Sequence, residues 1–224
     1  MFSPRVVSLV PSATETLIAW GRPPLACTRF CEQPSLPQVG GTKNPDLRAI
    51  RALAPDLVVV DREENRREDH DALVAAGLDL HVVEIRSLAD VDPAMTALAA
   101  RVEATWDLIG EIQPVEMTRR AAVPIWRRPW IWLAEPTYGT SLLEALGVHN
   151  VVLDRGPYPS IDLDEVVELG ADLVIAPDEP YEFGEQHRAE LSQIAPVRFV
   201  DGKDLVWWGA RTRGALERLG AELG

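Results

Sequence analysis

The apolar residues in the first half of the chain fall into short runs separated by amphipathic stretches. The runs predict strands at 6–10, 25–28, 57–60 and 80–84. The stretches between them have helical spacing and predict helices at 12–21, 45–54 and 65–76. Regular alternation of strands and helices predicts βαβ units around a parallel sheet.

The second half of the chain repeats this order. It predicts strands at 130–134, 150–153, 173–176 and 197–200, and helices at 140–146, 162–169, 185–194 and 212–223. The two copies align with residues 6–21 over 132–147 and with residues 46–60 over 162–176. A period of about 120 residues is too long for a solenoid and indicates two similar lobes. Two lobes leave a cleft between them, where small ligands usually bind.

The stretch between the two copies has no strand pattern and predicts one long helix from Asp92 to Pro114. Its apolar residues recur at steps of three and four and give the helix one apolar face, formed by Met95, Leu98, Val102, Trp106, Ile109 and Ile112. The expected architecture is therefore α/β, with two Rossmann-like lobes that have parallel sheets and are joined by a long backbone helix. The predicted boundaries are 1–86 for the first lobe, 87–127 for the helical linker and 128–224 for the second lobe.

The charge balance of the chain argues against a nucleic-acid partner. The 224 residues include 22 basic and 35 acidic side chains, for a net charge of −13, whereas phosphate binding needs a basic surface. No apolar stretch approaches the length of a membrane span, so we predict no membrane insertion. The N-terminal residues lack the pattern of an export signal and predict a cytoplasmic protein, or a periplasmic or extracellular one if such a signal has been cut away.

The residues that usually hold metals are too few and too scattered to predict a metal site or a protein-bound cofactor. Cys27 and Cys31 have no matching histidines, and we favour two buried reduced thiols over the alternative of a disulfide. The histidines fall in four different elements, as His70, His81, His149 and His187. The common hydrolase, nucleotide-binding and metalloprotease motifs are missing, so no catalytic residue is predicted.

Two stretches of sequence carry a resemblance to a known family. RVVSLVPSATETL (5–17), GGTKNPDLRAIRALAPDLVVVD (40–61), a long helix and a second similar lobe together resemble the class III substrate-binding proteins of ABC importers. Within this family of cobalamin and ferric-siderophore receptors, the chain is most similar to the cobalamin branch. The resemblance implies a non-catalytic protein that holds a corrinoid or another metal chelate in the cleft between its lobes, with an importer permease as its partner. The alternative is a cytosolic enzyme or biosynthetic accessory protein on the same scaffold.

The candidate ligand-binding residues come from loops and from one helix terminus. Hydroxyl groups at the start of the first helix could donate hydrogen bonds to a ligand, and Arg211 could pair with a ligand carboxylate or amide. Aromatic residues at 158 and 207–208 come after predicted strands, and they lie in segments similar to the family's ligand-facing loops. The full predicted set is Ser12, Thr14, Phe30, Tyr138, Tyr158, Trp207, Trp208 and Arg211.

Overall fold

The computed structural model of the chain describes residues 4–113 and 115–224 and divides into two compact units. The first unit contains Met1–Glu84, Asp90–Leu108 and Trp208–Arg211. The second unit contains Ile85–Ala89, Ile109–Trp207 and Thr212–Gly224. Residues of the predicted linker 87–127 therefore belong partly to each unit.

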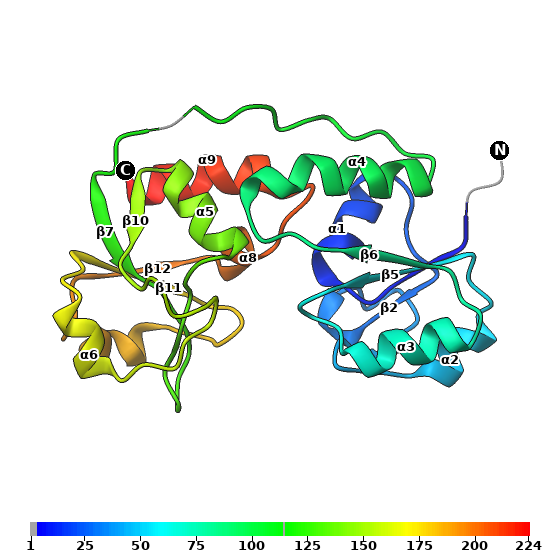
Figure 1. Cartoon of the computed structure of the whole chain (residues 1–224), viewed down its shortest axis with the longest axis horizontal. Helices are drawn as coiled ribbons and strands as arrows, with labels where there is room; N and C mark the ends of the chain where they lie inside the picture. Colours follow the sequence, from blue (N-terminus) through cyan, green and yellow to red (C-terminus); the bar gives the residue numbers. More distant parts are fainter. Residues whose placement is uncertain (1–3, 114) are drawn as a thin grey trace. The chain divides into compact units, whose positions relative to one another are not determined.

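The first unit is built on a four-stranded parallel sheet with the order β2-β1-β5-β6. Its strands are β1 (Val6–Ser8), β2 (Ala26–Cys27), β5 (Leu57–Asp61) and β6 (Leu80–Val83). Helices cover both faces: α1 (Pro11–Ala19) and α4 (Val91–Arg101) on one, α2 (Leu47–Ala52) and α3 (Arg67–Ala75) on the other (Figure 1). Because both faces are covered, the central strands are continuous apolar runs, and every residue of β1 and β5 is buried.

A short antiparallel hairpin, β3 (Gly40–Gly41) with β4 (Asn44–Pro45), precedes α2 in the first unit. The sequence predicted Pro45 as the first residue of the helix, and this was wrong by two residues. Pro45 pairs within the hairpin, and Asp46 becomes the N-cap of α2, where its side chain accepts a hydrogen bond of 2.9 Å from the Ala49 N–H.

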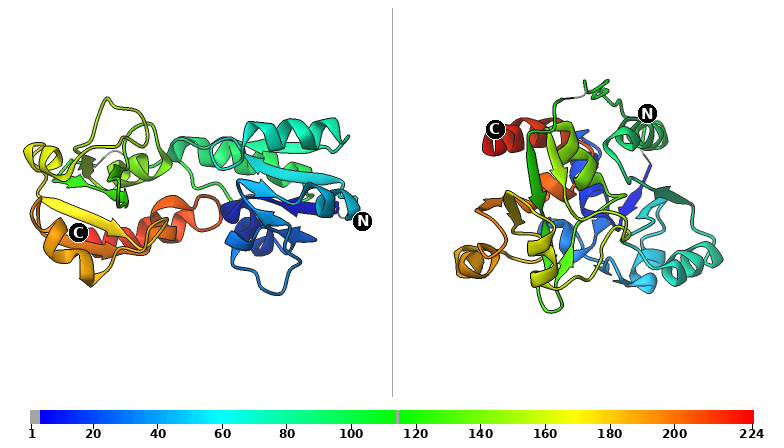
Figure 2. Two further views of the ribbon diagram at one scale, coloured as in Figure 1. Left: turned by 90° about the horizontal axis from the view of Figure 1, so that it is seen from below. Right: turned by 60° about the vertical axis from the view of Figure 1, so that its left-hand side comes forward.

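The sheet of the second unit has the order β10-β7-β11-β12 and is also entirely parallel. When the strands of each sheet are counted along the chain, both sheets have the second strand at one edge, followed by the first, third and fourth. Its strands are β7 (Arg119–Ala122), β10 (Val148–Asn150), β11 (Leu173–Pro177) and β12 (Val197–Val200). Its helices are α5 (Tyr138–Ala145), α6 (Leu163–Glu168), α7 (Arg188–Leu191), α8 (Gly202–Val206) and α9 (Thr212–Leu223). The right-hand view of Figure 2 shows α9 (red) and α7 (orange) on opposite sides of this sheet. The predicted α/β class with two parallel sheets is confirmed.

The first strand of the second unit was assigned to the wrong residues. The sequence predicted it at 130–134, but the strand that pairs at this position in the sheet is β7, which lies inside the stretch predicted to lack strands. Arg119 and Arg120 make β7 too polar to be recognised as an apolar run, and the Arg120 side chain donates hydrogen bonds to the carbonyls of Leu169 and Gly170. The predicted residues instead contain β9 (Ile131–Trp132), which pairs antiparallel with β8 (Pro124–Trp126).

The predicted long backbone helix is not formed over its full length. Helix α4 begins close to the expected residue but ends at Arg101, and residues 104–113 contain no helix. Glu103 takes a left-handed backbone with φ 53°, and the guanidinium of Arg22 donates hydrogen bonds to the carbonyls of Val102 and Glu103. A side chain from elsewhere in the chain thus bonds the two carbonyls that come directly after the helix. The predicted end of the helix, Pro114, lies outside the described residues.

The sequence contains two spacings typical of a capping box, Ser12 with Glu15 and Asp162 with Glu165, and neither box is formed. The N-cap of α1 is Val10, and Ser12 lies inside the first turn without capping the helix. At the start of α6, Asp162 occupies the N-cap position as predicted, but its side chain makes no capping hydrogen bond. Within the described residues, no helix has the length and apolar character needed to cross a membrane.

Candidate functional site

The carboxyl ends of the parallel strands define where ligand contacts are expected in each unit, because doubly wound sheets bind ligands beyond those ends. In the first unit, this edge is formed by the segments that come after β1, β2 and β5. In the second unit, it is formed by the segments that come after β10, β7, β11 and β12.

The predicted hydroxyl residues of the first edge are both buried. The Thr14 hydroxyl donates to the Val10 carbonyl at 2.9 Å and lies 3.2 Å from Cys31 Sγ, so its hydrogen-bonding capacity is used inside the protein. Ser12 differs, because its Oγ is buried and has no hydrogen-bond partner among the described residues. Of these two residues, Ser12 is the one that retains a hydroxyl able to bond a ligand.

The two cysteines of this edge are buried and reduced, and no disulfide joins them. A hydrogen bond from the Cys27 thiol lowers the pKa of Cys31 below that of an ordinary thiol, and the hydroxyls of Thr14 and Thr28 favour the thiolate further. The same hydrogen bond, together with burial, raises the pKa of Cys27. Because Cys27 is fully buried and Cys31 is 2% exposed, the pair belongs to the interior of the edge.

The loop after β5 folds back on itself around two acidic groups, the buried Asp61 and the half-buried Glu64. Asp61 accepts hydrogen bonds from the backbone N–H groups of Glu63 and Glu64, and Asn65 ties the loop to the Thr42 carbonyl at 2.8 Å. Burial raises the pKa of Asp61 to about 6. Burial also raises the pKa of Glu64 to about 8, with further increases caused by the negative charges of Asp61 and Cys31. A carboxyl group that stays protonated near neutral pH is therefore part of this edge.

The remaining predicted residues of the first unit lie in two places. Phe30 is 49% exposed, and the guanidinium of Arg29 lies 4.6 Å from the centre of its ring. Trp208, in contrast, is only 4% exposed. Arg211 is held in an ion pair with Glu15 on α1, at 2.6 Å and 3.0 Å.

The segment that carries Trp208 and Arg211 packs closely on α1. The Ala210 N–H donates to Thr16 Oγ1 at 3.0 Å. Gly209 has a φ of 95°, and a side chain there would overlap the Thr16 hydroxyl and approach the sulfur of Met95. The close approach requires glycine at this position. Trp208 and Arg211 are therefore both engaged inside the first unit.

The predicted residues of the second unit separate by exposure. Tyr138 is 5% exposed, and its hydroxyl donates to Thr212 Oγ1 at 3.0 Å. Trp207 is half-buried, with the ammonium of Lys203 5.3 Å from its ring centre. Tyr158 is 47% exposed. Its loop is fixed to β9 and to the residues after it, because the Trp132 and Ala134 N–H groups donate hydrogen bonds to the carbonyls of Pro159 and Pro157.

The structure reveals aromatic residues of the second edge that sequence reasoning missed. Trp126 is 43% exposed and lies edge-on to Tyr181, with 5.6 Å between the ring centres. Each of the four neighbouring strands is followed by at least one aromatic residue that is partly or fully exposed. We call this set the aromatic edge: Tyr158 after β10, Trp126 after β7, Tyr181 after β11 and Trp207 after β12.

A stack of buried rings supports the aromatic edge. Tyr181 contacts Phe183 at 4.7 Å, and Phe183 stacks on Trp130 at 6.1 Å with only 4° between the ring planes. Trp130 in turn stacks on Trp132, which is fully buried. The sequence did contain a usable pattern, since Trp126, Trp130 and Trp132 lie close together in the chain, but the pairing of β8 with β9 was needed to interpret it.

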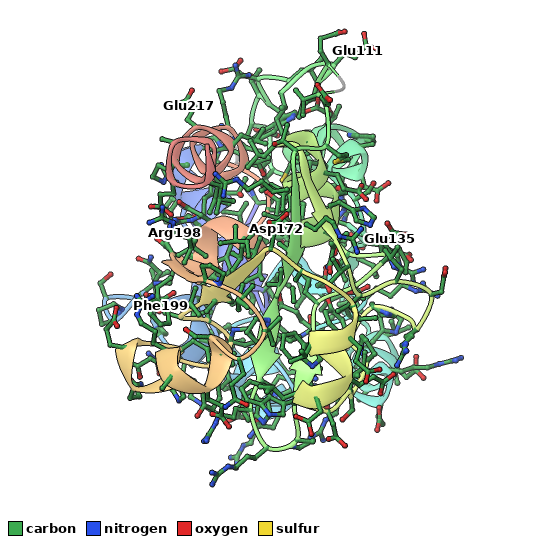
Figure 3. All side chains as sticks on the ribbon, turned by 90° about the vertical axis from the view of Figure 1, so that its left-hand side faces the viewer. Glu111, Glu135, Asp172, Arg198, Phe199 and Glu217 are labelled. Atoms are coloured by element: carbon green, nitrogen blue, oxygen red, sulfur yellow. The ribbon has the colours of Figure 1, made fainter. Side chains whose placement is uncertain are left out.

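The cavities of the two units lie away from these edges. A cavity of about 440 Å³ opens at the amino end of the second sheet, where Asp172 is labelled in Figure 3, and is lined by Thr118, Arg119, Leu146, Val148, Asp172, Leu223 and Gly224. A second cavity, of about 340 Å³, lies between β6 and α4 of the first unit. The first cavity is at the opposite end of its sheet from the carboxyl ends, where a doubly wound fold binds ligands, and the second lies along the side of β6.

The described residues contain no group of three or more histidine, cysteine or acidic side chains that could hold a metal ion. His187 is buried beside the aromatic stack, where its Nδ1 accepts a hydrogen bond of 3.2 Å from the Gly184 N–H and its Nε2 lies 3.4 Å from the Tyr181 hydroxyl. These contacts explain His187 as part of the packing. The arrangement can bind a ligand through aromatic faces and a few polar groups, and among the described residues it offers no set of protein ligands for a bare metal.

The chain contains two parallel doubly wound sheets of the same strand order, and they define a fold of two similar α/β lobes. Solved structures share it over 99% of this chain. A periplasmic vitamin B12 binding protein of Vibrio cholerae is 20% identical, with a TM-score of 0.80 and 96% of that chain covered. A periplasmic heme-binding protein solved with two hemes is 18% identical, with a TM-score of 0.78 and 98% of that chain covered.

Curated relatives agree with the fold. A vitamin B12-binding protein of Salmonella paratyphi A is 24% identical over 191 residues, which cover 77% of this chain and 72% of that protein. Its counterpart in Pectobacterium atrosepticum is 24% identical over 196 residues, covering 76% of this chain and 70% of that protein. No family model matches the chain. The resemblance to the class III substrate-binding proteins of ABC importers, first drawn from the sequence motifs, is confirmed by these comparisons.

Proposed function

We propose that the protein is a non-catalytic binding protein for a large, flat metal chelate, with a cobalamin-like corrinoid as the first candidate and another chelate such as heme or a ferric siderophore as the second. The observation that carries this proposal is the aromatic edge of the second unit. Aromatic rings bury a large apolar area with little loss of rotamer entropy, which suits the flat face of a macrocycle.

The polar first edge supports the same function by a different chemistry. The unpartnered hydroxyl of Ser12 and the raised pKa of Glu64 provide groups that can donate hydrogen bonds to the amides or carboxylates at the rim of a chelate. The metal would arrive inside its own chelator and would need no ligand from the protein. The location of the ligand between the two lobes stays a prediction.

The relatives support the proposal through their names. The curated relatives are named vitamin B12-binding proteins, and the solved neighbours include periplasmic vitamin B12 and heme binding proteins. We infer that this protein acts in the periplasm and delivers its ligand to the permease of an ABC importer. The cytoplasmic location predicted from the N-terminal residues has no support among these relatives. Fractionation of the source cells, with detection by antibody, tests the location.

A ligand titration tests the proposed function. The wild-type protein is incubated in turn with aquocobalamin, hemin and a ferric siderophore, and absorption spectra are recorded after gel filtration. We expect at least one chelate to elute with the protein and to quench its tryptophan fluorescence. If none of the three is retained and none quenches the fluorescence, the proposed function is wrong.

A pair of variants at Tyr158 tests whether the aromatic edge carries the binding. Tyr158→Ala should weaken binding of the chelate by about 2 kcal/mol, the range of an interface hot spot, because the substitution removes an exposed ring that the ligand could contact. Tyr158→Phe keeps the ring and should bind nearly as tightly as the wild type. Equal affinity of the alanine variant, with an unchanged melting temperature, would remove Tyr158 from the site.

A further inference from the structure

The turn between β8 and β9, residues 126–130, combines an exposed indole with two arginines in a protein of net charge −13. It lies beyond the carboxyl end of β7 and forms the lowest part of the second unit in the view of Figure 1, where it is drawn in green. None of these residues belongs to the ligand-binding set predicted from the sequence.

Contacts with Tyr181, Glu190 and Phe183 fix the position of the turn. Trp126 packs edge-on against Tyr181, and the guanidinium of Arg127 pairs with Glu190 at 2.7 Å, with both side chains of that pair mostly shielded. Trp130, at the other end of the turn, stacks on Phe183. A ring whose surroundings are fixed in this way can stack on a ligand with little further loss of entropy.

Arg128 differs from its neighbour Arg127 in two respects. Its side chain is exposed and, within the described part of the chain, makes no hydrogen bond or ion pair. Its backbone has a φ of 67°, in the left-handed region that an arginine rarely occupies and that glycine occupies freely. An arginine kept at a position that favours glycine is an outlier that points to a role for its side chain.

We propose that the turn 126–130 is a ligand contact of the second unit, in which Trp126 stacks on a flat ring system and Arg128 pairs with a carboxylate at the rim of that ring. The second unit would then select planar chelates that carry free carboxylates over chelates whose rim groups are uncharged amides. This inference rests on the proposed function, because it assigns further contacts and a charge preference to the same ligand.

The test compares hemin, which has two free carboxylates, with its dimethyl ester, which has none. Arg128→Gly should weaken hemin binding about fivefold, in the range of a partly exposed ion pair, and should leave binding of the ester unchanged. Arg128→Lys keeps the charge and should retain most of the preference for hemin. Trp126→Ala should weaken both ligands about tenfold, whereas Trp126→Phe should retain most of the affinity.

A stability measurement separates this proposal from a structural role. Glycine accepts a positive φ without strain, so Arg128→Gly should melt at the same temperature as the wild type or higher while binding hemin less well. Equal loss of hemin and ester, or no loss of either, would overturn the role of Arg128. Binding of aquocobalamin without binding of hemin would overturn the selectivity but leave the proposed function standing. If the wild type binds no chelate at all, the proposed function fails and this inference fails with it.

Discussion

The two units arrange their four strands in the same order, and they differ in the segments at the carboxyl ends of those strands. The first edge is polar and largely closed: Thr14, Cys31 and Asn65 form their hydrogen bonds with other parts of the same unit. The second edge is aromatic and open, with Trp126 and Tyr158 more than 40% exposed.

The difference shows that two sheets of one topology can take separate tasks. A closed polar edge fixes a few hydrogen-bonding groups in space, and an open aromatic edge provides exposed apolar surface for contact with a ligand. A chelate with a polar rim and a flat face needs both. Fold alone predicts where a ligand contact lies, and the loops decide its chemistry.

The largest expected effect is the loss of stability on substitution of Trp208, which tests whether the first edge is closed. Because this side chain is 4% exposed, Trp208→Ala should lower the free energy of unfolding by about 3–5 kcal/mol, measured by chemical denaturation. At the open edge, Tyr158→Ala should change the free energy of unfolding by less than about 1 kcal/mol.

Trp208→Phe serves as the control, since it keeps an aromatic ring in the same space and should lose less stability than the alanine variant. An alanine variant with wild-type stability and lost ligand affinity would place Trp208 in the binding site. The description of the first edge as closed would then be wrong.

The strand order of the first unit could be predicted from sequence because its strands are continuous apolar runs, as in the VVV of β5. The corresponding strand of the second unit could not, because β7 begins with two arginines whose charges are exposed at the sheet end. The end of α4 was missed for a related reason. It depends on Arg22, far away in the chain, and on a left-handed glutamate where a glycine would have been recognised.

The site was predictable only where exposure can be read from loop position. Tyr158 lies in a loop rich in proline and glycine and is 47% exposed, and its contact with a ligand stays a prediction. Trp207 and Trp208 are adjacent in sequence, yet one is half-buried and the other is interior, because Gly209 brings the chain down onto α1 directly after them. No local pattern reports that close approach.

The pH dependence of stability tests Glu64, the half-buried acid of the first edge, and the expected effect is of intermediate size. Burial raises the pKa of Glu64 from 4.5 to about 8, so the folded protein holds a proton that the unfolded chain releases near pH 4.5. The stability due to this group is complete below about pH 4.5 and is lost as the pH rises towards 8. Glu64→Gln should remove this loss and be more stable than the wild type at pH 8.5 by about 1–2 kcal/mol.

Glu63→Gln is the matched control, because it removes the same charge at the next residue, which is exposed. Its melting temperature should follow the wild-type pH profile between pH 5 and pH 8.5. Parallel profiles for all three proteins would show that Glu64 is solvated, and the first edge would then be more open than described.

The smallest effect is expected at Ser12, and it bears directly on whether the closed edge also binds. Its buried Oγ has no hydrogen-bond partner among the described residues, and an unsatisfied buried polar group costs free energy. Ser12→Ala should therefore raise the stability of the free protein by about 0.5–1 kcal/mol. If the hydroxyl bonds the chelate, the same variant should bind it about threefold to tenfold more weakly, because one hydrogen bond is lost. Ser8→Ala is a suitable comparison, since the Ser8 hydroxyl already donates to the Val10 carbonyl and its removal should cost stability without affecting affinity. A more stable Ser12→Ala variant with unchanged affinity would leave the first edge a purely structural surface and assign ligand recognition to the aromatic edge alone.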